Sequence, residues 1–249
     1  MEERITSRKN ALLVRVRKLL SSRREREAAG LFVSDGTKLL SEAVRWYSGL
    51  DTVILSDGIQ VQLPEQVRVI RVPEDVMASI SPMESPQGAV FLCRMPEKTP
   101  FVPKPGMLLL DGIQDPGNLG TILRTADALD TEVALLEGCA DPYSHKVVRA
   151  AMGAVFRRSV IQADWETVRT GCAAAGIPIG VTALCDGAKD LRQWELRDMA
   201  VVIGSEGQGV RPCILEQAEA KLIIPMNPQC ESLNAAIAAA IVMWQMTKL

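Results

Sequence analysis

Residues 107–127 read MLLLDGIQDPGNLGTILRTAD and combine three local signals in one segment. The first four residues form an uninterrupted apolar run, which is typical of a strand buried on both faces of a sheet. A loop containing glycine and aspartate follows, and then apolar residues recur at helical spacing, at Ile122, Leu123 and Ala126. This order of strand, loop and helix predicts one unit of a sheet covered by helices.

Four further apolar runs follow, at intervals that leave room for helices between them. They are Val133–Leu136, Ile177–Val181, Met199–Ile203 and Leu222–Ile224. Strands that are apolar along their whole length are typical of a parallel sheet with helices on both faces. We therefore predict an α/β fold with a mostly parallel sheet. Because ligands bind at the carboxyl ends of such strands, we expect the chemistry in the loops after Leu110, Ile203 and Ile224.

The first hundred residues also alternate helix and strand signals. A charged amphipathic helix is predicted near residues 7–28, and apolar spacing predicts a second helix through Leu39 to Trp46. Short strands are predicted at residues 31–33, 52–55, 67–72 and 89–93. This part of the chain is therefore expected to form an α/β domain of its own.

Residues 95–106, MPEKTPFVPKPG, contain four prolines. Proline removes a backbone donor and restricts φ, so neither a helix nor a central strand fits this segment. We predict a first domain of residues 1–96, a linker of residues 97–106 and a second domain of residues 107–249.

Composition excludes a membrane protein and disfavours a metal site. The chain is 47% hydrophobic and 23% charged, and it has no run of about 18 uncharged apolar residues. Residues 1–4 do not begin a secretory signal, so we expect a cytoplasmic protein. The six cysteines include no C-x-x-C pair and His145 is the single histidine, so no bound metal is expected.

Charge is distributed unevenly along the chain. Residues 1–27 contain nine Lys and Arg against four Glu, a net charge of +5, whereas the whole chain carries −2. A basic helix can contact nucleic-acid phosphates by charge alone. A solvated helix face accounts for the same residues, and the segment alone does not decide between these interpretations.

Each of the three loops holds polar or glycine residues that suggest binding. In the first loop, Asp115 or Asn118 can cap the next helix, and Arg124 on that helix is well placed to hold a phosphate or carboxylate. A capped helix with an exposed arginine is the alternative.

Residues 204–210, GSEGQGV, contain three glycines and match neither common nucleotide-binding pattern, so we expect their backbone to lie against a ligand.

The third segment, residues 224–241, reads IPMNPQCESLNAAIAAAI. Ser232 is predicted to be the N-cap of the closing helix. One apolar stripe on this helix is predicted to pack into the core. Its members are Leu233, Ala236, Ile237, Ala240, Ile241 and Trp244. Core packing does not explain the polar Asn234 beside the cap.

Taken together, the three loops resemble the three motifs of the SpoU (TrmH-like) family within the SPOUT superfamily. The matches are Asn118–Ala126 to N-L-G-x-I-x-R-T-A, Gly204–Gly209 to G-[NS]-E-G-x-G, Ile224–Met226 to I-P-M, and Ser232–Asn234 to S-L-N. Residues 144–154 are similar to the family's K-V-x-R-A-[SA]-x-G-A helix. The resemblance covers residues 107–249.

The N-terminal part is similar to the L30e-like RNA-binding domain that is often attached to these enzymes. The matching segments are Ile5–Asn10, Phe32–Gly36 and Gln87–Gly88. Asp35 stands where the family commonly has glutamate, and Pro86 stands where it has histidine.

The resemblance implies an S-adenosylmethionine-dependent RNA methyltransferase that modifies a ribose 2′-hydroxyl. It also implies a trefoil knot in the second domain, a rare exception among folds, and a homodimer. The residues implied to hold the cofactor are Gly204, Glu206, Gly207, Ile224, Met226 and Leu233. Arg124 is expected to bind phosphate or stabilise developing charge, because a guanidinium is effectively never deprotonated. Asn118, Glu206, Ser232 and Asn234 are expected to orient it, the hydroxyl and the cofactor.

Three alternatives stand beside this hypothesis. Large-subunit (23S) ribosomal RNA is the expected substrate, because the basic helix and the L30e-like domain fit such family members better, and transfer RNA is the alternative. A non-catalytic RNA-binding protein is disfavoured because all polar motif positions are present. A nucleotide-dependent oxidoreductase is disfavoured because G-x-G-x-x-G is absent.

Overall fold

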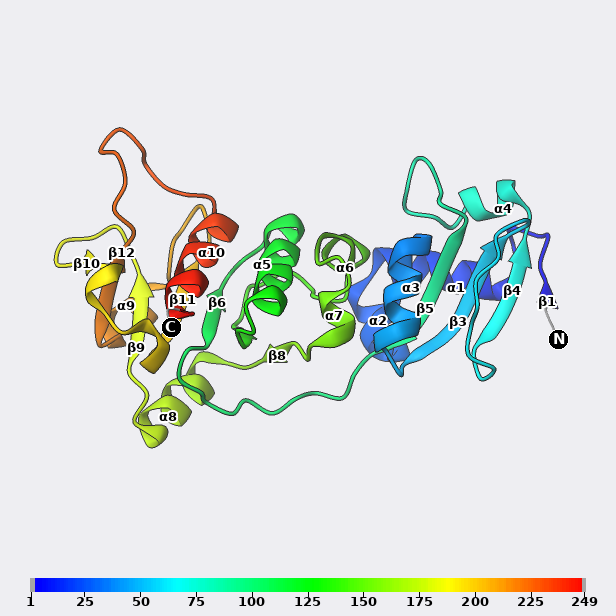
Figure 1. Ribbon diagram of the computed structural model, residues 1–249. Coiled ribbons are helices and arrows are strands. Elements are labelled where there is room, and N and C mark those ends of the chain that lie inside the picture. Colours follow the sequence, from blue (N-terminus) through cyan, green and yellow to red (C-terminus); the bar gives the residue numbers. More distant parts are fainter. Residues whose placement is uncertain (1–2, 248–249) are drawn as a thin grey trace. The chain divides into compact units, whose positions relative to one another are not determined.

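The computed structural model describes residues 3–247; residues 1–2 and 248–249, the outer ends of the two predicted domains, lie outside the described residues. The chain divides into two compact units (Figure 1). The first unit runs to Glu97 and includes Asp141–Arg157. The second unit combines Lys98–Ala140 with the residues from Arg158 onward.

The first unit contains a five-stranded sheet in the order β1-β4-β3-β5-β2. Its strands are β1 (Glu3–Arg4), β2 (Leu31–Asp35), β3 (Leu50–Ser56), β4 (Arg68–Val72) and β5 (Ala89–Arg94). Its helices are α1 (Ala11–Ser21), α2 (Arg23–Ala29), α3 (Thr37–Trp46), α4 (Glu74–Ala78), α6 (His145–Ala150) and α7 (Ala154–Arg157). Strands β1, β4 and β3 are parallel, whereas β5 is antiparallel to β3 and β2. The four strands predicted here are confirmed.

The single helix predicted near residues 7–28 is wrong. The helix is interrupted at Ser22, whose backbone is extended and whose hydroxyl accepts a hydrogen bond from the Glu25 amide. Asn10 caps α1 in the same way through the Leu12 amide. A side-chain cap satisfies amides that a continuous helix would satisfy itself, so one amphipathic pattern covers two helices.

The segment Asp141–Arg157 lies inside the predicted second domain but is part of the first compact unit. The ring of Phe32 on β2 packs against Tyr143 and Phe156, with ring centroids 5.2 and 6.3 Å apart. Arg26 and Asp141 form an ion pair at 2.5 Å in which both side chains are buried. Burial of the two aromatic rings stabilises this placement, and the ion pair leaves neither of the two buried charges without a partner.

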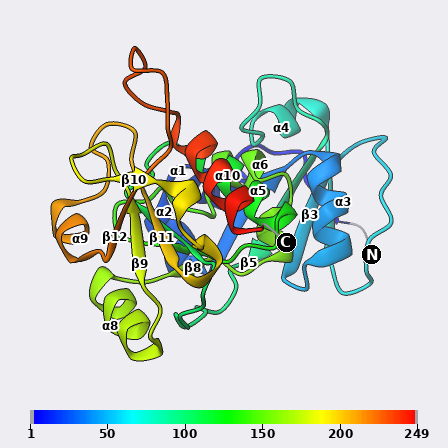
Figure 2. The ribbon, with the colours of Figure 1, turned by 60° about the vertical axis from the view of Figure 1, so that its left-hand side comes forward.

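The second unit contains a seven-stranded sheet in the order β10-β12-β9-β11-β6-β7-β8, and every pair in it is parallel. Its strands are β6 (Leu108–Asp111), β7 (Val133–Leu135), β8 (Ile161–Gln162), β9 (Ile179–Thr182), β10 (Lys189–Asp190), β11 (Ala200–Gly204) and β12 (Ala220–Ile223). Figure 2 shows β12, β9 and β11 side by side. The predicted parallel sheet and its five apolar strands are confirmed, whereas the two-residue strands β8 and β10 carried no apolar run.

Helices cover both faces of this sheet. Trp165 and Val168 of α8 (Trp165–Ala175) and Ile214 of α9 (Pro212–Gln217) share one core with residues of β6 and β11. On the other face, α10 (Ala235–Met246) packs against β11 and against α5 (Pro116–Ala128). Between Arg94 and Leu108 the chain forms neither helix nor strand, as its prolines predict.

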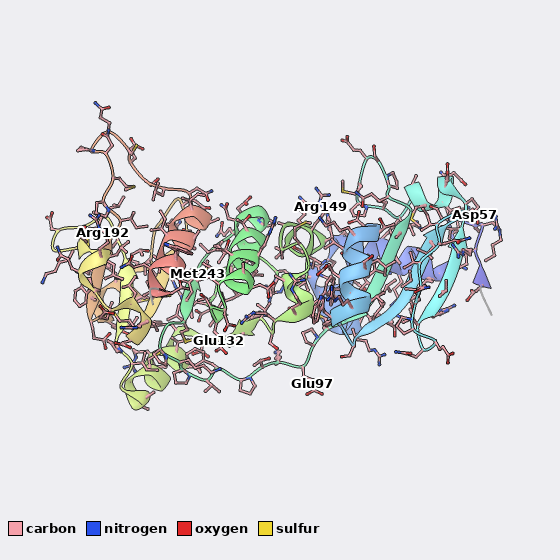
Figure 3. All side chains as sticks on the ribbon, in the orientation of Figure 1. Asp57, Glu97, Glu132, Arg149, Arg192 and Met243 are labelled. Carbon is pink, nitrogen blue, oxygen red and sulfur yellow. The ribbon has the colours of Figure 1, made fainter. Side chains whose placement is uncertain are left out.

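The predicted orientation of α10 is wrong. The residues that face the protein are Ala235, Ala236, Ala239, Val242, Met243 and Met246. Met243 is labelled in Figure 3. Ile237 and Trp244, assigned to the core from the sequence, are 52% and 67% exposed. Because α10 is apolar all round, helical periodicity could not select the face that packs.

Among the described residues, no helix is both long and apolar enough to cross a membrane. The six cysteines are all free thiols.

Candidate functional site

The carboxyl ends of β6, β9, β11 and β12 meet at one edge of the parallel sheet. The register places Asp111, the last residue of β6, opposite Gly204, the last residue of β11. The loops that follow these strands therefore start from neighbouring points. This is the edge at which α/β sheets bind their ligands.

The loop after β11 folds back tightly on itself. The backbone amides of Ser205 and Gly209 each donate to the other's carbonyl, at 3.1 and 2.9 Å. A Cβ atom at Gly204 would overlap the backbone of Gly209 and Val210. Gly209 has a φ of +66°, in the left-handed region that favours glycine. Glycines at 204 and 209 are therefore requirements of this loop.

An ion pair holds the end of the same loop. Asp111, whose side chain is 1% exposed, accepts hydrogen bonds from the Arg211 backbone amide at 2.8 Å and from Arg211 Nε at 2.6 Å. Arg211 also donates to Glu137 at 2.8 Å. A buried carboxylate with two donors on one residue ties the chain after the glycine loop to the end of β6.

A cavity of about 480 Å³ lies among these loops, within the size range of small-molecule sites. Its lining comes from the segments after β9, β11 and β12 and from the start of α10. It is formed by Thr182, Ala183, Leu184, Cys185, Ile203, Gly204, Ser205, Glu206, Gln208, Gly209, Val210, Leu215, Leu222, Ile223, Ile224, Met226, Glu231, Ser232, Leu233, Ala235 and Ala238. Backbone and apolar side chains dominate this wall.

Most residues that the sequence assigned to a cofactor line this cavity. They are Gly204, Glu206, Ile224, Met226 and Leu233. Gly207, which is exposed on the same loop, is not among the lining residues. Of the residues assigned to catalysis, Glu206 and Ser232 also line the cavity.

Sequence reasoning missed the wall that follows β9. Thr182, Ala183, Leu184 and Cys185 line the cavity, and the Thr182 hydroxyl donates to the Val202 carbonyl at 3.1 Å. The apolar strand before them was predicted. The carboxyl-end rule, applied to that strand as well, could have found this segment.

A chain of side-chain hydrogen bonds connects all three loops. The Asn118 amide group on α5 donates to the Glu206 carboxylate after β11. Asn234, before α10, donates to Asn118 Oδ1 at 3.0 Å. These hydrogen bonds therefore connect Glu206 in the cavity wall to Asn118 in the first turn of α5, and Asn118 to Asn234 at the start of α10. The paired residues lie 88 and 116 positions apart in the sequence.

The caps of these helices position the chain of hydrogen bonds. Asp115 caps α5 by accepting from the Asn118 amide at 2.8 Å. Asn234, not Ser232, is the N-cap of α10, so the predicted cap is wrong. Asn234 Oδ1 accepts from the amides of Ala236 and Ile237 at 3.0 and 3.3 Å. Asn234 thus caps one helix and donates to Asn118 with the other end of its amide.

Arg124 lies on α5, two turns after Asn118, and its side chain is exposed. Its guanidinium makes no hydrogen bond or ion pair with any other residue in the part of the chain that the structure describes. An unpaired guanidinium in this position is free to bind an anionic group from solution.

The Cys139 thiol lies near this edge, and its surroundings do not favour a nucleophile. Burial raises the pKa of the Cys139 thiol, which donates to the Leu110 carbonyl at 3.2 Å. A thiol with a raised pKa is a poor nucleophile. Within residues 3–247, no group of three His, Cys, Asp or Glu side chains is placed to hold a metal ion. The site offers binding, orientation and a free positive charge.

Family models match both parts of the chain. The model of the SpoU rRNA Methylase family matches residues 105–244. The model of the MRM3-like substrate binding domain matches residues 12–90.

Two RNA methyltransferases are similar to this protein along most of the chain. The 23S rRNA guanosine 2′-O-methyltransferase RlmP of Bacillus subtilis is 32% identical over 92% of this chain and 93% of its own length. The mitochondrial rRNA methyltransferase 3 of Homo sapiens is 28% identical over 91% of this chain and 70% of its own length.

Solved structures agree with these matches. An AdoMet-bound rRNA methyltransferase from Sinorhizobium meliloti superposes with a TM-score of 0.86 at 28% identity, covering 98% of this chain and 97% of that one. The SpoU methyltransferase AviRb from Streptomyces viridochromogenes, in complex with the cofactor AdoMet, gives a TM-score of 0.80 at 26% identity, covering 96% and 97%.

Proposed function

Because the chain belongs to the SpoU rRNA methylase family, we propose that it transfers a methyl group from S-adenosylmethionine to a ribose 2′-hydroxyl of RNA. One observation carries this proposal. The hydrogen bonds of Asn118, Glu206 and Asn234 join three separate loops beside a cavity of about 480 Å³. These hydrogen bonds join residues from different segments, so the local folding of one loop does not account for them.

The cavity fits the cofactor. Gly204 and Gly209 bring bare backbone to its wall, and the apolar side chains of Ile224, Met226 and Leu233 line it as well. Backbone groups can recognise the edges of an adenine and a ribose, while apolar side chains flank the ring. When bound, S-adenosylmethionine supplies a methyl group on a positively charged sulfur. Gly204, Glu206, Ile224, Met226 and Leu233 would hold it, and Gly207 would contribute backbone from the same loop.

The protein's own residues then have two tasks, to orient the ribose and to favour its nucleophilic oxygen. We assign the first task to the hydrogen-bonded chain of Asn118, Glu206 and Asn234, together with Ser232 on the cavity wall. Fixed polar groups that are already paired with one another need little reorganisation when the substrate binds.

We assign the second task to Arg124. A guanidinium does not act as a plain base, because it is effectively never deprotonated. It can hold an RNA phosphate through two hydrogen bonds and stabilise the negative charge that develops on the ribose oxygen as the hydroxyl proton passes to a water molecule. Its exposure and lack of a partner within residues 3–247 agree with such a role.

Ribosomal RNA is the proposed substrate, and transfer RNA is the alternative. Two relatives that match along most of the chain, RlmP and the mitochondrial rRNA methyltransferase 3, are named as methyltransferases of ribosomal RNA, and a substrate-binding domain model matches the first unit. A cytoplasmic location and a trefoil knot around the loops after β11 and β12 are parts of the same proposal.

The test is transfer of labelled methyl from S-adenosylmethionine to ribosomal and transfer RNA in separate reactions. We expect label in ribosomal RNA only. S-adenosylhomocysteine at 100 times its Kd is expected to stabilise the fold by about 2.7 kcal/mol and raise its Tm, whereas NAD is not. Binding of S-adenosylhomocysteine without label in either RNA would favour a precursor RNA as the substrate or the non-catalytic alternative.

We further propose that the protein is a homodimer that uses the outer face of α10. Ile237, Ile241 and Trp244 follow one another at spacings of four and three residues, and all three are exposed. Large apolar side chains that share one helix face and are exposed in a single chain indicate a contact surface. A second copy can cover this face with the same residues, as a two-fold interface requires.

Replacing Ile241 by aspartate is expected to weaken dimerisation by at least about 100-fold, because each interface would bury unpaired charge. Light scattering over a range of concentrations measures the change in mass. Val102→Asp, at another exposed apolar residue, is the matched control and should leave the mass unchanged. A wild-type protein that is monomeric at every concentration would contradict the proposal.

A further inference from the structure

Trp46, the last residue of α3, is 49% exposed. The spacing of Leu39, Ala43 and Trp46 would place all three on one face of the helix, yet only Leu39 and Ala43 are buried. The helical spacing predicts that Trp46 is buried, yet about half of its surface is exposed to water. A large exposed aromatic side chain of this kind indicates a binding surface.

The core under this end of α3 does not need Trp46, because Tyr47 occupies it. The Tyr47 ring lies 6.0 Å from Phe32 and 5.5 Å from Phe156 between centroids. Its hydroxyl donates to the Arg94 carbonyl at 2.6 Å. Loss of the Trp46 ring should therefore leave this aromatic core in place.

Positive charge accompanies the exposed ring. The Arg45 guanidinium carbon lies 4.8 Å from the centroid of the Trp46 ring. Lys38 and Arg45 are both exposed, lie seven residues apart on the same side of α3, and form no ion pair with another residue of 3–247. Glu42, the one acidic residue of α3, is already paired with Arg157. The outer side of α3 thus carries uncompensated positive charge next to an aromatic face.

We propose that Trp46 and Arg45 form a stacking site for an unpaired base of the RNA substrate, with Lys38 contacting a neighbouring phosphate. Unpaired bases stack on aromatic and guanidinium planes, and cations along the same element follow the phosphates. Duplex RNA keeps its bases stacked internally and offers none to Trp46. The inference rests on the proposed function for the kind of substrate, since it assigns part of the RNA contact to the first unit.

The test uses the full-length protein, a single-stranded oligouridylate and a duplex RNA of equal length. Binding of the single strand is expected to change tryptophan emission in the wild type and much less in Trp46→Phe, which keeps an aromatic ring. Trp46→Ala is expected to weaken single-strand binding by about 5- to 100-fold and to leave duplex binding unchanged. Circular dichroism and the Tm report whether each variant is folded.

Salt dependence separates the ring from the charge. Lys38→Ala is expected to lower the slope of log affinity against log salt by about 0.7, because one phosphate contact is lost, whereas Trp46→Ala should keep the slope. Arg169→Ala, at a half-exposed arginine of α8 that pairs with Glu166, is the control and should change neither affinity nor slope.

Wild-type affinity of Trp46→Ala for the single strand, or equal losses for single strand and duplex, would overturn the stacking site. Neither result depends on catalysis, because binding is measured without S-adenosylmethionine. Failure of the proposed function would instead appear as absence of methyl transfer by the wild type to any RNA.

Discussion

Arg124→Ala is expected to reduce methyl transfer to RNA by at least about 10²- to 10³-fold, with affinity for S-adenosylhomocysteine essentially unchanged. The guanidinium is outside the cavity lining and has no partner in the part of the chain that the structure describes. Its removal therefore takes away a charge from the reaction without disturbing the cofactor wall or the fold. Single-turnover methyl transfer and calorimetric titration with S-adenosylhomocysteine measure the two quantities.

Arg124→Lys tests the geometry of this charge. Lysine keeps the positive charge but loses the planar pair of donors, so we expect only partial recovery of the rate. Arg169→Ala again serves as the control, here for loss of a half-exposed helical arginine that pairs with Glu166, and should retain full activity. A large loss of cofactor affinity in Arg124→Ala would contradict the assignment and place the residue in cofactor binding.

Gly204→Ala is expected to destabilise the protein by about 3 kcal/mol and to abolish cofactor binding. A Cβ there would overlap the backbone of Gly209 and Val210, and backbone atoms cannot rotate away as a flexible side chain can. The loop would have to open, and it forms part of the cavity wall. Urea denaturation and calorimetry with S-adenosylhomocysteine measure the two effects.

Gly207→Ala is the matched control in the same loop. No atom lies within 4 Å of a Cβ built at Gly207, and its φ is not in the left-handed region. Its stability should stay within about 0.5 kcal/mol of the wild type. If Gly204→Ala had the same stability and the same cofactor affinity as the wild type, the loop would not be packed as described.

Local patterns in the chain were sufficient to predict the parallel sheet and the loops that hold the site. Runs such as Met107–Leu110 and Met199–Ile203 are apolar along their length because both faces of their strands are covered. A glycine is needed at 204 because a Cβ there would overlap the backbone five positions further along the chain, and it is favoured at 209 because φ is +66°. These features depend on neighbours close in sequence or on one residue's own backbone, so they can be read without the fold.

Long-range packing decided the rest. The buried face of α10 depends on β11 and α5, and a helix that is apolar all round does not record which face they will cover. Asp141–Arg157 belongs to the first unit because Tyr143 and Phe156 meet Phe32 more than a hundred positions earlier. The hydrogen bonds of Asn118 with Glu206 and Asn234 likewise join loops distant in sequence. Such pairings are contacts between elements, and only the tertiary structure brings their partners together.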